Sequence, residues 1–154
     1  TQAKTLFPYT TLFRSGFRQL YANTFTDNLL AKAKVTCALS EGKGRNVIDD
    51  NYDTSVRPKM KDGKAVFSFK LNKPATFNVL SVQEDIRKGQ RVEKFSLEVK
   101  DAKGNWKKVT EGTTVGHKRL LKFPVETAKE VRLIISEVRA VPAISEIGLY
   151  RLRD

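Results

Sequence analysis

Hydrophobic and polar residues alternate along much of this chain. Between Lys94 and Asp101 (KFSLEVKD), the apolar side chains of Phe95, Leu97 and Val99 fall on one face and polar side chains on the other. This period of two predicts a half-buried β-strand. The same alternation recurs in Ala65 to Leu71 and in Val131 to Ile135, whereas Phe77 to Val82 is apolar enough to predict a strand buried on both faces.

Short turn signals separate these segments. They are Asp62-Gly63, Asn72-Lys73-Pro74, Lys88-Gly89, Lys103-Gly104-Asn105 and Gly112. Many short strands at this spacing predict an all-β fold, an antiparallel sandwich or barrel. No internal repeat or second-domain boundary interrupts the pattern, so we expect one β-domain.

The segment from Gly16 to Lys34 follows a different period. Its apolar residues are spaced for an amphipathic helix or helical turn: Phe17, Leu20, Tyr21, Phe25, Leu29 and Leu30. We therefore expect a short N-terminal helical segment, a connector ahead of the β-domain.

The composition is that of a globular domain that can form a real core, with 40% hydrophobic residues in 154. No apolar run is long enough for a membrane span. The single cysteine, Cys37, excludes an internal disulfide framework, and its apolar neighbours favour a buried small hydrophobe over a nucleophile.

The formal net charge of +12 favours anionic partners or a solvated basic surface. Basic residues concentrate in Arg57 to Lys73 and in His117 to Lys122. Neither stretch has a helix-turn-helix pattern, zinc spacing or an aromatic RNA-binding signature, so we expect no nucleic-acid partner.

Catalytic motifs are missing from the sequence. His117 is the only histidine, and there is no Gly-x-Ser-x-Gly motif or phosphate-binding glycine loop. We expect no catalytic residue in this chain.

Oxygen-bearing side chains are densely spaced in Asn46 to Thr54 (NVIDDNYDT). Calcium takes six to eight hard oxygen ligands, which Asp49, Asn51, Asp53 and Thr54 could partly supply. An acidic turn in a surface loop is the alternative interpretation.

Several segments in a fixed order give a family resemblance. They are Asn28 to Ser40, the loop ending in Asp53-Thr54, Leu71 to Pro74, Phe95 to Val99, Gly104-Asn105-Trp106, Val131 to Leu133 and Ile144 to Tyr150. Together they resemble the coagulation factor five/eight type C, or discoidin, domain. The resemblance implies a jelly-roll-like antiparallel β-sandwich of the galactose-binding-domain type.

The same resemblance implies a structural calcium ion that ties the first long loop to the last strand. The implied ligands are the Asp49 and Glu146 carboxylates, the Asn46, Asn51 and Ser145 carbonyls, and the Thr54 hydroxyl and carbonyl. It also implies that Trp106 is a core residue rather than a sugar platform. One departure follows Thr54, where the family usually has a tryptophan two positions on and this chain has Val56. Loss of that aromatic requires the segment from Ser55 to Lys64 to repack, or marks it as a second sequence error.

A narrower resemblance comes from Phe77 to Ile86, Gly89 to Val92 and Thr114 to Arg119. These runs are similar to the C-terminal domain of bacterial family 29 α-L-fucosidases, in which a catalytic (β/α)-barrel precedes the sandwich. The resemblance implies that residues 16–31 are a helical linker from a lost catalytic domain and that residues 32–154 are the sandwich. The parent protein would then be a secreted or periplasmic α-L-fucosidase.

The residues Thr5 to Ser15 (TLFPYTTLFRS) match one reading frame of a common sequencing adapter. We therefore expect residues 1–15 to be foreign to the fold. The alternative is an ordinary short apolar strand.

These observations lead to a functional hypothesis, that of a non-catalytic accessory domain that docks on the catalytic barrel or binds fucosylated or galactosylated glycan. The polar loops supply four candidate contacts, either with sugar or with the barrel: Arg57, Arg91, His117 and Arg119. The alternatives are a free-standing lectin-like module and a basic adhesion domain for anionic polymers.

Overall fold

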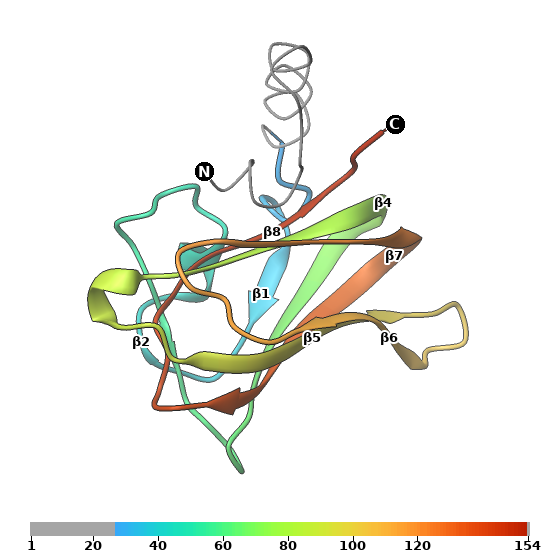
Figure 1. Cartoon of the computed structure of the whole chain (residues 1–154). Coiled ribbons are helices and arrows are strands. Elements are labelled where there is room, and N and C mark those ends of the chain that lie inside the picture. The colour runs from blue at the N-terminus through green and yellow to red at the C-terminus, as the bar shows by residue number, and fades with distance from the viewer. Residues whose placement is uncertain (1–26, 154) are drawn as a thin grey trace, which may run out of the picture.

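The computed structural model describes residues 27–153. That part of the chain contains eight strands and two short 3-10 helices (Figure 1). In order they are β1 (Lys34–Thr36), β2 (Leu39–Glu41), η2 (Gly44–Val47), β3 (Arg57–Pro58), β4 (Ala65–Glu84), η3 (Ile86–Lys88), β5 (Val92–Lys100), β6 (Trp106–Gly112), β7 (Arg119–Val138) and β8 (Ile144–Tyr150).

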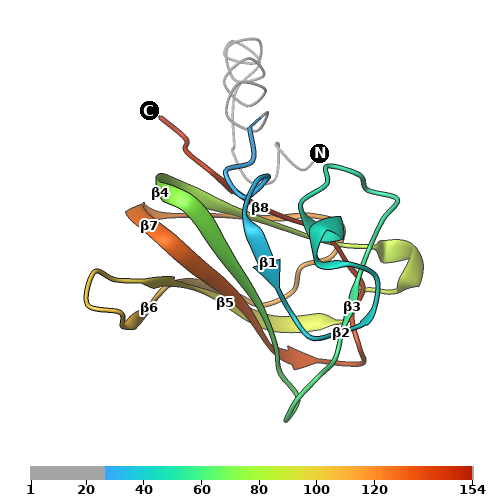
Figure 2. The same ribbon diagram turned by 180° about the vertical axis from the view of Figure 1, so that it is seen from behind.

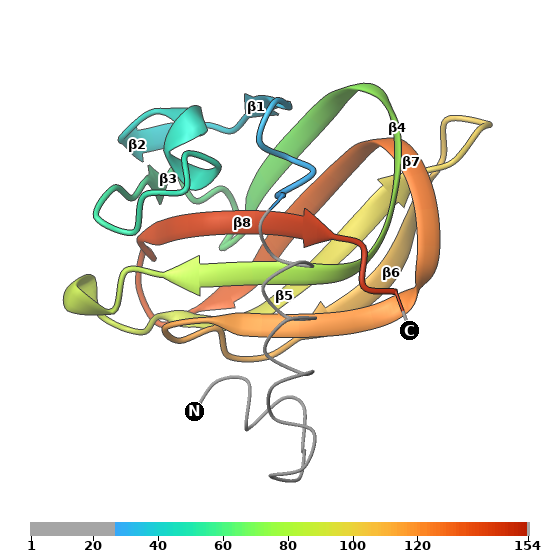
Figure 3. The same ribbon diagram turned by 90° about the horizontal axis from the view of Figure 1, so that it is seen from above.

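Two long, bent strands, β4 and β7, build both layers of a sandwich. The first half of β4 pairs with β1 and with the second half of β7, which in turn pairs with β5 and so connects to β6. The second half of β4 pairs with the first half of β7 and with β8. Figure 3 shows β4 and β7 curving from one layer into the other. Figure 2 shows β1 beside β4 at the edge of the larger layer.

The core lies between the layers, where alternation points one side chain in two inward. Phe67, Phe95 and Leu133 of the larger layer are almost fully buried, as are Leu80 and Ile147 of the smaller one. Burying each such side chain contributes about 1.5–3 kcal/mol. A second, smaller cluster covers the other face of the smaller layer and consists of Val79, Leu120 and Leu152, with Tyr150 packed against it.

The all-β antiparallel fold predicted from the alternation is confirmed, and of the two architectures that the alternation left open, a sandwich or a barrel, it is the sandwich that the family resemblance implied. The burial of Phe77 to Val82 on both faces has a direct cause, because the main core covers one face and the smaller cluster the other. The turn expected at Asn72-Lys73-Pro74 is wrong. These residues lie within β4, where the pairing register with β7 shifts between Lys70 and Ala75. Proline cannot donate to the ladder, and the irregularity bends the strand instead of ending it.

The start of the described chain is fastened to the last strand. Asn28 donates its amide to the Ile147 carbonyl at 2.9 Å, and its Oδ1 accepts the amides of Leu30 and Leu149 at 3.0 and 3.1 Å. Single turns close between Asn28 and Ala31 and between Leu30 and Ala33, with no helix in residues 27–33. Most of the expected helical linker, and the whole of residues 1–15, lie outside the described residues.

Two further expectations concern Cys37 and the membrane. Cys37 is half-buried and packs against the main core, and burial raises the pKa of its thiol to about 11, as expected of a small hydrophobe rather than a nucleophile. Within residues 27–153, no helix has the length and hydropathy to cross a membrane.

Candidate metal loop and ligand-facing loops

The acidic loop after η2 closes around the hydroxyl group of Thr54. The Thr54 Oγ1 atom lies 2.6 Å from Asp49 Oδ2, 2.9 Å from the Asn51 carbonyl oxygen and 3.5 Å from the Asn46 carbonyl oxygen. The Asn46 side-chain amide also donates to Asp49 Oδ2 at 3.4 Å. Four of the residues predicted as calcium ligands thus place oxygen atoms around one point.

Short polar side chains shape this loop locally. Asp49 Oδ1 accepts the Asn51 amide at 3.1 Å, and Asn51 Oδ1 accepts the Asp53 amide at 3.0 Å. Asp50 has a φ of 54°, a left-handed conformation that Asp and Asn tolerate better than most residues. The sequence therefore folds the loop through its own side chains, and the carbonyls turn inward.

Glu146 of β8 lies beside the loop and is 5% exposed. Burial, followed by the negative charge of Asp49, raises the pKa of its carboxyl group to about 8, while a hydrogen bond from the Asp50 backbone opposes the shift. Its Oε1 atom is buried with no hydrogen-bond partner in residues 27–153. A buried carboxylate with an unpaired oxygen next to a second carboxylate is costly unless a proton or a cation neutralises it.

The residues beside the loop suit a hard cation that binds neutral oxygen ligands as well as carboxylates. The Ser145 hydroxyl donates to the Gln83 carbonyl at 3.3 Å. The Ser145 oxygen that the family resemblance assigns to the metal is the backbone carbonyl. No group of three or more His, Cys, Asp or Glu side chains that could hold a metal occurs in residues 27–153. The set is therefore two carboxylates with hydroxyl and carbonyl oxygens, which fits calcium better than zinc.

Arg87 links the acidic loop to the loop after β4. Its guanidinium donates to both Asp85 oxygens, at 2.9 and 3.0 Å, and reaches Asp53 Oδ1 at 3.4 Å. The hydrogen bond from Arg87 is the main cause that holds the pKa of Asp85 below its ordinary value of 3.8. This link was not predicted from the sequence. The Asp-x-Arg spacing at a turn was its only local signal.

Two of the four predicted contact residues converge on one atom. Arg57 Nη1 donates to the Val141 carbonyl oxygen at 3.1 Å, and Arg91 Nη1 donates to the same oxygen at 2.9 Å. Arg57 also pairs with Glu41 at 3.3 Å. The remaining N–H groups of both half-buried guanidinium groups are available for a ligand or a partner surface.

Buried Glu84 links the Arg91 loop to the loop that bears the other two predicted contact residues, His117 and Arg119. One of its carboxylate oxygens accepts the Arg91 and Val92 amides at 2.8 and 3.0 Å, and the other accepts the Gly116 amide at 3.1 Å. The neighbouring His117 is exposed. Arg119, at the start of β7, donates to the Thr114 carbonyl at 3.3 Å. The structure therefore places the Arg91 and His117 loops side by side.

Two predictions about core residues, one for the segment after Thr54 and one for Trp106, have different outcomes. The segment without the family tryptophan repacks, because Val56 is 1% exposed and exchanges two 2.9 Å backbone hydrogen bonds with Ile144. The expected core position of Trp106 is wrong. It pairs with outward-facing Lys100 and is half-buried on the outer face of the larger layer, with the Arg132 guanidinium carbon 4.2 Å from its ring centroid.

Comparisons with known proteins agree with this architecture. The family model of the F5/8 type C domain matches residues 31–147. The chain is 34% identical to Alpha-L-fucosidase 1 of Arabidopsis thaliana, over 87% of this chain and 28% of that protein. It is 31% identical to the Ruminococcus gnavus GH29 fucosidase solved in complex with fucose, over 91% of this chain and 30% of that one, with a TM-score of 0.76.

The crystal structure of SpGH29 superposes with a TM-score of 0.83 at 28% identity, over 90% of this chain and 31% of that one. The chain thus spans about three tenths of the length of these relatives. With its two bent strands, its paired layers and a family match over most of its length, the chain belongs to the F5/8 type C domain family.

Proposed function

We propose that this chain is the accessory domain of a secreted family 29 α-L-fucosidase and that its loops dock on the catalytic barrel. The observation that carries the proposal is that the sandwich aligns with about three tenths of the length of proteins described as fucosidases. On this proposal the chain supplies no catalytic group. Secretion follows from the same resemblance.

The docking surface consists of the Arg91 loop and the loop that bears His117 and Arg119. Glu84 fixes both loops through three backbone hydrogen bonds, so their positions relative to the sandwich are set before any partner binds. Preorganised loops lose little conformational entropy on docking. The half-buried Arg91 and Arg119 and the exposed His117 supply donors that suit a partner surface with carboxylates and carbonyls.

A second candidate function, binding of fucosylated or galactosylated glycan, is favoured by the Arg57–Arg91 pair. Both guanidinium groups are held in place by the Val141 carbonyl, and their planar forks can serve neighbouring sugar hydroxyls. A free-standing lectin-like module would use the same pair.

We also propose that calcium binds at the acidic loop. Asp49 and Glu146 would supply carboxylates, Thr54 its hydroxyl and carbonyl, and the remaining predicted ligands, Asn46, Asn51 and Ser145, backbone carbonyls. The support is the cluster of oxygens around Thr54 and the unpaired, buried Glu146 Oε1. The ion would neutralise two neighbouring carboxylates and tie the loop to β8.

A glycan array with the isolated chain, together with activity assays on the intact enzyme, separates docking from sugar binding. Docking predicts no glycan binding by the isolated chain and lower activity of the intact enzyme after His117→Ala or Arg119→Ala. Binding of fucosylated or galactosylated glycan that Arg91→Ala abolishes would support the second candidate instead. Lys103→Gln, in the exposed turn between β5 and β6, is the matched control.

A further inference from the structure

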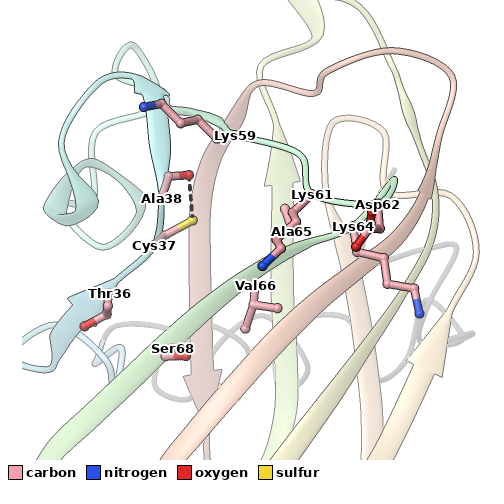
Figure 4. Close-up of a pocket in the computed structure, with 10 residues that line it drawn as sticks. All are labelled: Thr36, Cys37, Ala38, Lys59, Lys61, Asp62, Lys64, Ala65, Val66 and Ser68. Atoms are coloured by element: carbon pink, nitrogen blue, oxygen red, sulfur yellow. Dashed lines mark hydrogen bonds between the residues drawn. The ribbon is translucent and has the colours of Figure 1, made fainter.

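Two cavities adjoin on the outer face of the larger layer. One has a volume of about 600 Å³ and lies among β1, the 59–64 segment and the start of β4 (Figure 4). The other, of about 200 Å³, continues along β1 and β4 toward Trp106. Thr36 and Ser68 line both cavities, so the two form one continuous depression, which we call the lysine groove.

The lysine groove is named for the five lysines along it, Lys34, Lys59, Lys61, Lys64 and Lys70. None of the five forms an ion pair within residues 27–153. The acidic residues that line the two cavities are Asp62 and Glu130. Glu130 is already paired with Lys100 at 3.3 Å. Within the described residues, the groove therefore has more positive than negative charge.

Four of these lysines form two pairs in which like charges lie opposite each other. Lys34 and Lys70 are direct cross-strand partners between β1 and β4, and on its other side Lys70 is opposite Glu130 of β7. Lys61 and Lys64 are direct partners across the Asp62-Gly63 turn. Like charges directly opposite on neighbouring strands destabilise a sheet. The two pairs hold positive charge along one depression, where an anionic ligand would relieve the repulsion.

The floor and one wall of the groove suit a sugar chain. The hydroxyl-bearing residues Thr36 and Ser68 line its centre, and Trp106 lines the far end. Figure 4 shows the Lys61 side chain extending from its turn toward Val66, over the floor. Arg132 lies over one face of the Trp106 ring. The hydroxyl groups and the part of the ring that lines the cavity can contact sugar rings, while ammonium groups act as point charges for anionic substituents.

We propose that the lysine groove binds an anionic oligosaccharide, one whose sugars carry sulfate or carboxylate groups. This inference rests on the proposed role as a carbohydrate-enzyme accessory domain, and it names the class of glycan. The groove would hold charged substrate chains near the parent enzyme. It uses none of the four residues assigned to docking or to neutral sugar contact.

Binding is measured by isothermal titration calorimetry of the 154-residue chain with size-defined oligosaccharides of dextran sulfate and of polygalacturonate. Neutral dextran and a DNA duplex are the comparison probes. We expect binding to at least one anionic oligosaccharide, none to dextran, and weaker binding to DNA. Which of the two anionic probes binds distinguishes sulfate from carboxylate recognition. Affinity should fall as salt is raised, because exposed charges are screened.

The variants Lys70→Gln and Lys61→Gln should each lower the affinity about tenfold, the effect expected from loss of one charge-assisted contact. Lys103→Gln, which removes an exposed lysine outside the groove, should leave it unchanged. Lys34→Gln should weaken binding without lowering the melting temperature, because it also removes a repulsive pair.

An equal loss of affinity in Lys103→Gln would overturn the inference, since binding would then depend on net charge alone. Failure of both anionic oligosaccharides to bind, or tighter binding to DNA, would overturn it as well. A blank neutral-glycan array, in contrast, bears only on sugar contact by Arg57 and Arg91. Unchanged activity of the intact enzyme after His117→Ala or Arg119→Ala bears only on the proposed docking function.

Discussion

Asp49 Oδ2 lies 2.6 Å from the hydroxyl oxygen of Thr54, and this contact holds the acidic loop closed around a group of inward-facing oxygens. The hydroxyl proton partly offsets the Asp49 charge, whereas Glu146 Oε1 has no such partner in the described chain. The balance of charge in the loop is therefore sensitive to an added cation.

Calcium should raise the melting temperature of the chain, because a ligand that binds only the folded state stabilises it by mass action. Asp49→Ala and Glu146→Gln should each remove this response. Glu146→Gln should in addition stabilise the calcium-free chain at neutral pH, because the amide is neutral in both states, whereas the Glu146 carboxyl, with its raised folded-state pKa, must take up a proton on folding. Thermal unfolding in calcium and in chelator measures both effects, with Asp62→Asn as the control. Identical melting curves in the two conditions would contradict the metal proposal.

Acid should destabilise the chain through Asp85. Its folded-state pKa is lowered below 3.8, so it binds fewer protons when folded than when unfolded. The stabilisation is therefore present above about pH 4 and is lost as the pH falls through the folded-state value. Urea unfolding between pH 2 and pH 6 should show a shallower acid limb in Asp85→Asn than in the parent chain. Superimposable pH profiles would mean that the Arg87 hydrogen bonds contribute nothing to stability.

Glu84→Gln should lower the free energy of unfolding by about 1–3 kcal/mol, because an amide cannot accept all three backbone N–H groups that the carboxylate accepts. Chemical denaturation measures this loss. Glu137→Gln, at an exposed position of β7, is the matched control and should change stability little. If Glu84→Gln is as stable as that control, Glu84 does not anchor the two loops.

Deletion of residues 1–15 should leave the melting temperature unchanged, as expected of a segment foreign to the fold. Asn28→Ala should lower it by several degrees, since three hydrogen bonds to the start of the chain and to β8 are lost. Differential scanning calorimetry compares the two. A drop of several degrees after the deletion would place Leu6, Phe7, Leu12 or Phe13 in the core.

Alternation predicted the strands well because it records which side chains enter the core. Lys94 to Asp101 corresponds to β5, and Ala65 to Leu71 begins β4. The bend at Asn72-Lys73-Pro74 could not be distinguished from a hairpin, because the local signal is the same. What decides between them is that β7 continues to pair with β4 on both sides of the bend.

The candidate site could be predicted only where its residues lie close together in the sequence. The spacing of Asp49, Asn51 and Thr54 lies within one loop and predicted a cluster of oxygens. The meeting of Arg57 and Arg91 at Val141 depends on three segments brought together by the sandwich, and no spacing in the sequence encodes it. The outward position of Trp106 likewise follows from its register opposite Lys100, which the Gly-Asn-Trp turn alone does not determine.

The bend that carries β4 and β7 through both layers has a consequence for how the domain unfolds. Each layer uses half of the same two strands, so separating the layers would require breaking the ladder between β4 and β7. We therefore expect one cooperative transition, with amides in both halves of β4 exchanging with solvent at similar rates. A partner that binds one layer would then transmit force to the other layer directly along the backbone of β4 and β7.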